Sequence, residues 1–99
     1  MSARAVIANN TVTANRADGI ACGAGSVVQA NSVRGNTAVG IRVAGDDVIV
    51  AQNICAGNAV GIRVAVDVTN ASLVTNNMLD NTITLDDAGN DTSLFGNQS

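Results

Sequence analysis

The feature that most constrains the fold of this chain is a heptapeptide that occurs twice. The sequence AVGIRVA occupies positions 38–44 and again positions 59–65, so the two copies lie 21 residues apart. An identical segment at a fixed interval is typical of solenoid proteins, in which each repeat forms one structural unit that stacks on the next. The remainder of the chain follows the same period.

Asparagines recur through the whole chain at nearly this interval. One series has spacings of 21 to 23 residues, and a second series follows it by five residues. The first series is Asn10, Asn31, Asn53, Asn76 and Asn97, and the second is Asn15, Asn36, Asn58 and Asn81. We interpret both as corner residues, because asparagine tolerates the left-handed backbone of a sharp turn and stacked amides can hydrogen-bond to one another.

Apolar residues take fixed places relative to these asparagines. Three residues before the first series lie Ile7, Val28, Val50, Leu73 and Leu94, and two residues after it lie Val12, Val33, Cys55 and Met78. A third apolar column is Ile20, Ile41 and Ile62, with which we align Ile83 in the fourth repeat. Alternation of apolar and variable residues is the period of a half-buried strand. About 22 residues at roughly 3.3 Å each make a circuit of about 70 Å, which accommodates three short strands joined by turns.

The sequence therefore predicts an all-β fold, a parallel β-helix of about four to five turns with 21–23 residues per turn. We expect a single domain over residues 1–99, in which residues 86–99 form the last partial turn or a C-terminal cap. The 46% of hydrophobic residues supply a core, and β-branched residues are abundant while Glu and Lys are absent, which favours strands over helices.

The repeat pattern, Asn-x-Val followed by a second Asn and then Gly-Ile-x-Val, resembles the right-handed parallel β-helix of the pectin-lyase-like superfamily over about residues 5–98. That resemblance implies a right-handed coil. The superfamily includes polysaccharide lyases, glycoside hydrolases, uronate epimerases and phage tailspikes, whose active sites use Asp, Arg, Lys or His on an outer sheet face. This chain has no His and no Lys, so the resemblance carries over no catalytic residues. We expect no metal ion and no cofactor, and favour a protein that is not an enzyme.

A candidate ligand site comes from two arginines in equivalent repeat positions. Arg42 and Arg63 both follow a Gly-Ile pair, and acidic residues follow each of them at Asp46, Asp47 and Asp67. The simpler interpretation is that the arginines pair with these carboxylates on a solvated face. The alternative is a docking site for an acidic polysaccharide, because guanidinium groups bind carboxylates in a bidentate way.

A second candidate surface lies on the first strand of each turn, which is apolar on both faces. The outward positions include Val6, Ala8, Val27, Ile49, Ala51, Val74 and Phe95. A strand that is apolar on both faces is normally covered on both. We therefore predict a small non-enzymatic structural or binding module that self-associates through this stripe, as a dimer or a trimer. The alternatives are a carbohydrate-active protein and a repeat module of a tailspike or adhesin.

Charge and composition set the other expectations. The net charge of −3 and the single aromatic residue, Phe95, argue against nucleic acid as a partner. No apolar run reaches the roughly 18 residues of a membrane span, and no N-terminal stretch has the order of a signal peptide. The location stays unknown, with the cytoplasm slightly favoured. Cys22 and Cys55 fall in different columns, so we expect free, buried thiols.

Overall fold

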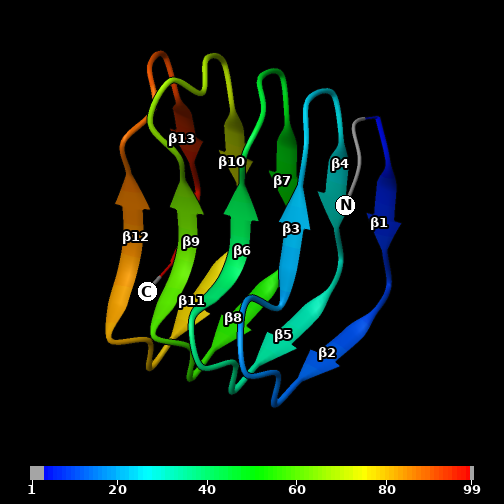
Figure 1. Ribbon diagram of the computed structural model, residues 1–99, viewed down its shortest axis with the longest axis vertical. Coiled ribbons are helices and arrows are strands. Elements are labelled where there is room, and N and C mark those ends of the chain that lie inside the picture. Colours follow the sequence, from blue (N-terminus) through cyan, green and yellow to red (C-terminus); the bar gives the residue numbers. More distant parts are fainter. Residues whose placement is uncertain (1–3, 99) are drawn as a thin grey trace.

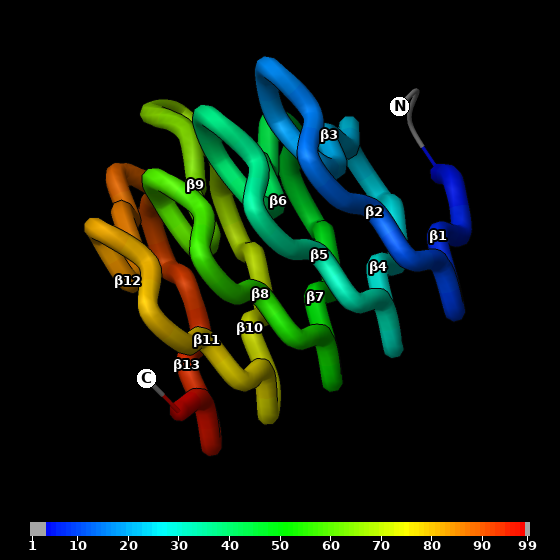
Figure 2. Tube along the Cα trace, turned by 90° about the horizontal axis from the view of Figure 1, so that it is seen from below, coloured from blue at the N-terminus to red at the C-terminus, as the bar shows by residue number. Residues whose placement is uncertain are grey.

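The computed structural model describes residues 4–98, and it confirms the parallel β-helix. Thirteen strands and no helix are present in this range. The strands form three parallel sheets. In Figure 1, the front sheet runs upward and the rear sheet downward while the chain advances from right to left, so the coil is right-handed. Figure 2 shows successive turns as neighbouring layers.

Each turn contributes one strand to each sheet. Sheet A contains β1 (Val6–Ala8), β4 (Val27–Gln29), β7 (Ile49–Ala51), β10 (Ser72–Val74) and β13 (Ser93–Phe95). Sheet B contains β2 (Thr11–Thr13), β5 (Ser32–Arg34), β8 (Ile54–Ala56) and β11 (Asn77–Leu79). Sheet C contains β3 (Ile20–Cys22), β6 (Val39–Val43), β9 (Val60–Val64) and β12 (Ile83–Asp87).

The predicted apolar columns line the interior. Val28 pairs with Ile7 and with Val50, and Ile41 pairs with Ile20 and with Ile62, as the repeat requires. The largest fully buried side chains include Ile41, Ile62 and Leu73. Leu94 keeps its predicted register opposite Leu73 but is 51% exposed, because no further turn among the described residues packs against it. Close packing of these columns is the main source of stability.

The predicted alignment of the fourth turn is wrong by two residues. Leu85 pairs with Ile62, whereas Ile83 pairs with Val60. The physical reason is that Asn81 stacks on Asn58 at the preceding corner. Ile62 lies four residues beyond Asn58, so the residue four beyond Asn81, which is Leu85, takes the matching place.

The asparagines do lie at the corners, and they form two continuous ladders. Asn53, which is 1% exposed, donates from Nδ2 to the Asn76 Oδ1 and to the Val28 carbonyl, each at 3.0 Å. Its Oδ1 accepts from the backbone N–H and the Nδ2 of Asn31, also at 3.0 Å. Since a buried amide without partners costs about 1–3 kcal/mol, these complete sets of hydrogen bonds let polar residues occupy the interior.

The left-handed residue at each of these corners is the residue before the asparagine, which corrects the prediction. Before the first ladder, φ is 59° at Asn9, 55° at Ala30, 57° at Gln52, 51° at Thr75 and 68° at Gly96. The ladder asparagine must direct its amide inward, so its predecessor makes the turn. Alanine, glutamine and threonine therefore occupy a conformation that costs a non-glycine residue about 1–2 kcal/mol.

Candidate functional site

The outer face of sheet A is an apolar surface without charge. Its two outward columns are Val6, Val27, Ile49, Ser72 and Ser93, and Ala8, Gln29, Ala51, Val74 and Phe95. Val6 and Phe95 are each 72% exposed, and Ile49 is 46% exposed. The predicted residues Ala8, Val27, Ala51 and Val74 are partly exposed on the same face. No described residue covers this face, so apolar side chains meet solvent across five strands.

The outer face of sheet C carries the two arginines. Arg42 and Arg63 pair in register on β6 and β9, as predicted from the repeat. Their acidic partners differ from the prediction. Arg42 donates from Nε to Asp18 Oδ2 at 2.6 Å and from Nη2 to Asp18 Oδ1 at 3.3 Å. Arg63 donates from Nε to Asp86 Oδ2 at 2.9 Å.

These ion pairs set the electrostatics of the face. The hydrogen bond from Arg42 lowers the pKa of Asp18; partial burial opposes this shift, and the Val39 N–H adds to it. Asp18 raises the pKa of Arg42 in return. Each arginine therefore has an internal counter-ion, which reduces the positive potential available to an external anion.

The residues Asp46, Asp47 and Asp67 lie away from the arginines, in the turns between sheets C and A. Asp46 Oδ1 accepts from the Thr69 N–H at 2.7 Å, and Asp47 Oδ1 accepts from Asn70 Nδ2 at 2.9 Å. Asp67 is not equivalent to Asp46, because the turn over residues 65–71 is longer than the turn over residues 44–48. The five predicted residues therefore form two separate groups.

The sequence did not identify Asp18 and Asp86 as the partners of the two arginines. Asp86 lies next to Arg63 in the same column, one turn later. The alignment of Ile83 with Ile62 shifted the fourth turn by two residues and therefore concealed this pairing. Asp18 reaches Arg42 from the loop before β3, one turn earlier. Ala21 occupies the column of Arg42 in the first turn, and Asp18 lies three residues before Ala21. This spacing was the signal in the sequence that could have identified Asp18.

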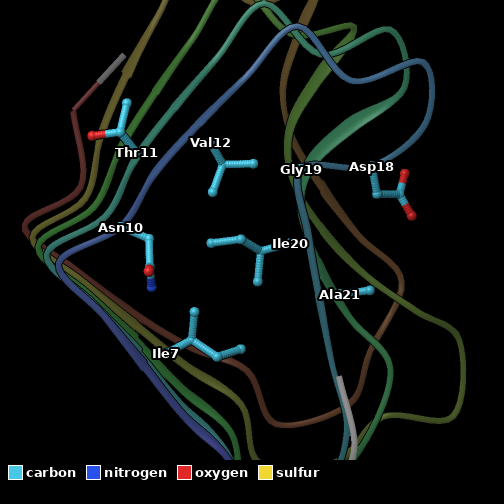
Figure 3. A pocket seen from close by; sticks show the side chains of 8 residues that line it. All are labelled: Ile7, Asn10, Thr11, Val12, Asp18, Gly19, Ile20 and Ala21. Carbon is cyan, nitrogen blue, oxygen red and sulfur yellow. The ribbon is translucent and has the colours of Figure 1, made fainter.

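An open cavity of about 450 Å³ lies at the first turn. Figure 3 shows Ile7, Val12 and Ile20 directed into it, while Asp18 points outward. Its interior is thus the apolar cross-section of the coil, and it lacks the convergent polar groups that fix a substrate.

The soft metal donors among residues 4–98 are few and buried. Cys22 and Cys55 are free and buried, as predicted. Burial raises the pKa of Cys22 to about 11 and that of Cys55 to about 12. Cys55 pairs with Met78 across β8 and β11, whereas Cys22 lies on sheet C. Within residues 4–98, no three His, Cys, Asp or Glu side chains lie together in a way that could hold a metal ion.

Comparison with known protein families identifies a match over the full length of the chain. The family described as "Periplasmic copper-binding protein (NosD)" matches residues 1–99. No curated protein and no solved structure matches the chain. Among residues 4–98 there is no helix long and apolar enough to cross a membrane.

The description of the family bears on the location of the chain and on metal binding. Its description is periplasmic, so the cytoplasmic location favoured from the sequence is wrong. Its description also names copper, which prefers imidazole, thiolate and thioether ligands. This chain has no histidine, and its described cysteines are buried protonated thiols on different sheets, so its described residues do not fit a copper ion.

The family match and the fold agree with each other. The match spans the whole chain, and the coordinates show the parallel β-helix that the repeat predicts. The chain therefore belongs to the NosD family.

Proposed function

We propose that this chain is a non-enzymatic binding module of the periplasm whose outer sheet A face binds a second copy of the chain. The observation that carries the proposal is the uncharged face of ten outward positions over five strands, with Val6 and Phe95 each 72% exposed. Burial of apolar surface contributes about 25 cal/mol per Å², so a flat face of this kind favours association. The rigid coil behind it holds the face in one shape.

The charged face supports catalysis and anion binding less well. Glycoside hydrolysis requires two carboxyl groups that flank one substrate bond. Asp18 and Asp86 instead each accept hydrogen bonds from a separate arginine. An acidic polysaccharide would have to displace these internal carboxylates to reach Arg42 and Arg63. Copper has no part in the proposed function, because the described donor set does not fit it.

The test is the oligomeric state in solution, measured by size-exclusion chromatography with light scattering over a range of micromolar concentrations. We expect the wild-type chain to associate and Ile49→Asp to be a monomer, since a carboxylate would be buried in the interface. Leu79→Asp is the matched control: Leu79 is 41% exposed, close to the 46% of Ile49, but lies on sheet B. Circular dichroism verifies that both variants fold.

Two results would contradict the proposal. A wild-type chain that stays monomeric throughout the concentration range has no such interface. Equal dissociation of Leu79→Asp and Ile49→Asp would show that the association does not depend on sheet A.

A further inference from the structure

We infer that the second copy binds across a two-fold axis that runs parallel to β7, so that the two coils lie antiparallel with their sheet A faces in contact. This inference rests on the proposed function and specifies its geometry. Such a rotation places the first turn of one copy opposite the fifth turn of the other. The middle strand, β7, faces the β7 of the partner subunit.

The sizes of the outward side chains are compatible with this axis. In one column, Val6, Val27 and Ile49 are followed by the small residues Ser72 and Ser93. In the other column the ends are reversed, with Ala8 at the first turn and Phe95 at the fifth, and the large Gln29 interrupts the order at the second turn. The two columns therefore end in large residues at opposite ends of the coil.

The two-fold rotation sets a bulky side chain against a small one at the ends of the face. Val6 meets Ser93 of the partner subunit, and Ala8 meets Phe95 of the partner subunit. At the centre, Ile49 meets the partner's Ile49, while the adjacent small Ala51 meets the partner's Ala51. The ends of the face are thus self-complementary in shape, as an isologous interface that closes as a dimer requires, whereas the large Gln29 meets Val74 of the partner subunit.

Charge at the rim supports the same axis. Arg4 and Asp91 occupy equivalent corner positions, two residues before β1 and β13, with φ of 57° and 55°. Both side chains are exposed. The rotation brings Arg4 close to Asp91 of the partner subunit, and it does so twice in the dimer. Asp47, at the same corner before β7, meets the partner's Asp47; this one like-charge contact opposes two attractive ones.

The competing arrangement lacks the charge complementarity. A two-fold axis parallel to the coil would place each turn opposite the same turn of the partner. Because that rotation exchanges the two columns, Val6 would meet Ala8 of the partner subunit and Ser93 would meet the partner's Phe95, so the side-chain sizes alone fit both arrangements. Arg4 and Asp91 would stay at opposite ends of the dimer. The face is also small for a specific interface, so we expect dissociation in the micromolar range.

Chemical cross-linking tests the axis. Facing sheets lie about 10 Å apart, which exceeds the reach of a disulfide, so a short bis-maleimide is the suitable reagent. The native thiols are buried, with pKa values of about 11 and about 12, and therefore give little background at neutral pH. We expect an equimolar mixture of Val6→Cys and Ser93→Cys to cross-link as a mixed dimer. Val6→Cys alone should not cross-link, because its two thiols lie four strand spacings apart, roughly 19 Å.

A charge exchange gives an independent measurement. We expect Arg4→Glu and Asp91→Arg each to weaken dimerisation about threefold to tenfold, as loss of exposed ion pairs does. The double variant should recover the wild-type dissociation constant. Failure of the double variant to recover, or cross-linking of Val6→Cys alone, would overturn the axis while leaving self-association intact. A monomeric wild-type chain would instead remove the proposed function.

Discussion

Gly40 lies directly against Asn58 of the following turn: a Cβ on Gly40 would be 2.8 Å from Asn58 Nδ2 and 2.6 Å from the Gly61 carbonyl oxygen. Gly19 has the same relationship to Asn36, and Gly61 to Asn81. The glycine of each repeat therefore makes room for the asparagine of the next. In the fourth turn Thr84 takes the place of the glycine. The second ladder ends at Asn81, so among the described residues no asparagine of a later turn needs this space.

Gly40→Ala is expected to destabilise the fold through this contact. Neither Asn58 nor the Gly61 backbone can move without breaking ladder hydrogen bonds. We therefore expect the free energy of unfolding, measured with urea, to fall by about 1–3 kcal/mol. Gly35→Ala is the control, because Gly35 has φ of 64° but no atom within 4 Å of the added Cβ. Gly35→Ala should lower the free energy of unfolding by about 1 kcal/mol, from backbone strain alone. Equal losses would refute the steric argument.

Asn53→Ala should be among the most damaging substitutions in the chain. It removes the acceptor of two Asn31 donors and the donor to the Val28 carbonyl, all buried. We expect a loss of about 3 kcal/mol or more, since each buried group left without a partner costs about 1–3 kcal/mol. Asn10→Ala, at the exposed end of the same ladder, should cost far less. Denaturant unfolding of both variants measures the difference.

Thr75→Gly should stabilise the protein. Thr75 is a β-branched residue at φ 51°, and glycine adopts this conformation without a steric penalty. The greater freedom of glycine in the unfolded chain offsets part of the gain, so we expect a net increase of about 0.5–1 kcal/mol. Thermal unfolding would show a higher midpoint. Thr69→Gly, at an exposed position without a left-handed backbone, is the control and should not stabilise.

The Asp18–Arg42 pair makes stability depend on pH at the acid end. Because the pKa of Asp18 is lower in the folded chain than its ordinary 3.8, the pair stabilises the fold above pH 3.8. That contribution is lost as the pH falls through the folded pKa. Arg42→Met should lower the free energy of unfolding by about 1 kcal/mol at pH 7, a small value because the pair is partly exposed. The difference in stability between the wild-type chain and the variant should shrink below pH 3.8. Arg16→Met, an exposed arginine without an ion pair among the described residues, should show no such pH dependence.

The cysteines should be inert in the folded chain. A pKa near 11 at Cys22 instead of 9.0 lowers its thiolate fraction about a hundredfold at pH 8, and that of Cys55 further. Thiol reagents should therefore modify both residues only after unfolding. For the same reason the folded chain should take no Cu(I) from a competing chelator. Stoichiometric Cu(I) uptake, abolished by Cys55→Ser, would show that copper does fit this chain.

The repeat in the sequence was sufficient to predict the coil, its period and most of its columns. Every circuit places like residues above one another, so Val28 and Val50, or Arg42 and Arg63, could be assigned as neighbours before any coordinates. The outward apolar positions followed from the same alternation. Where the repeat was irregular, as at Ile83, the alignment was wrong, because the asparagine ladder rather than the nearest isoleucine sets the register.

Only the tertiary structure decided how side chains of different turns pair. Arg42 could have met any of several carboxylates, and the choice of Asp18 depends on the path of the loop before β3. The same holds for Asp67, which a longer turn moves out of line with Asp46. A repeat determines which residues share a column because the period is a property of the chain. It does not determine contacts made by loops of unequal length, since these depend on where the backbone runs in space.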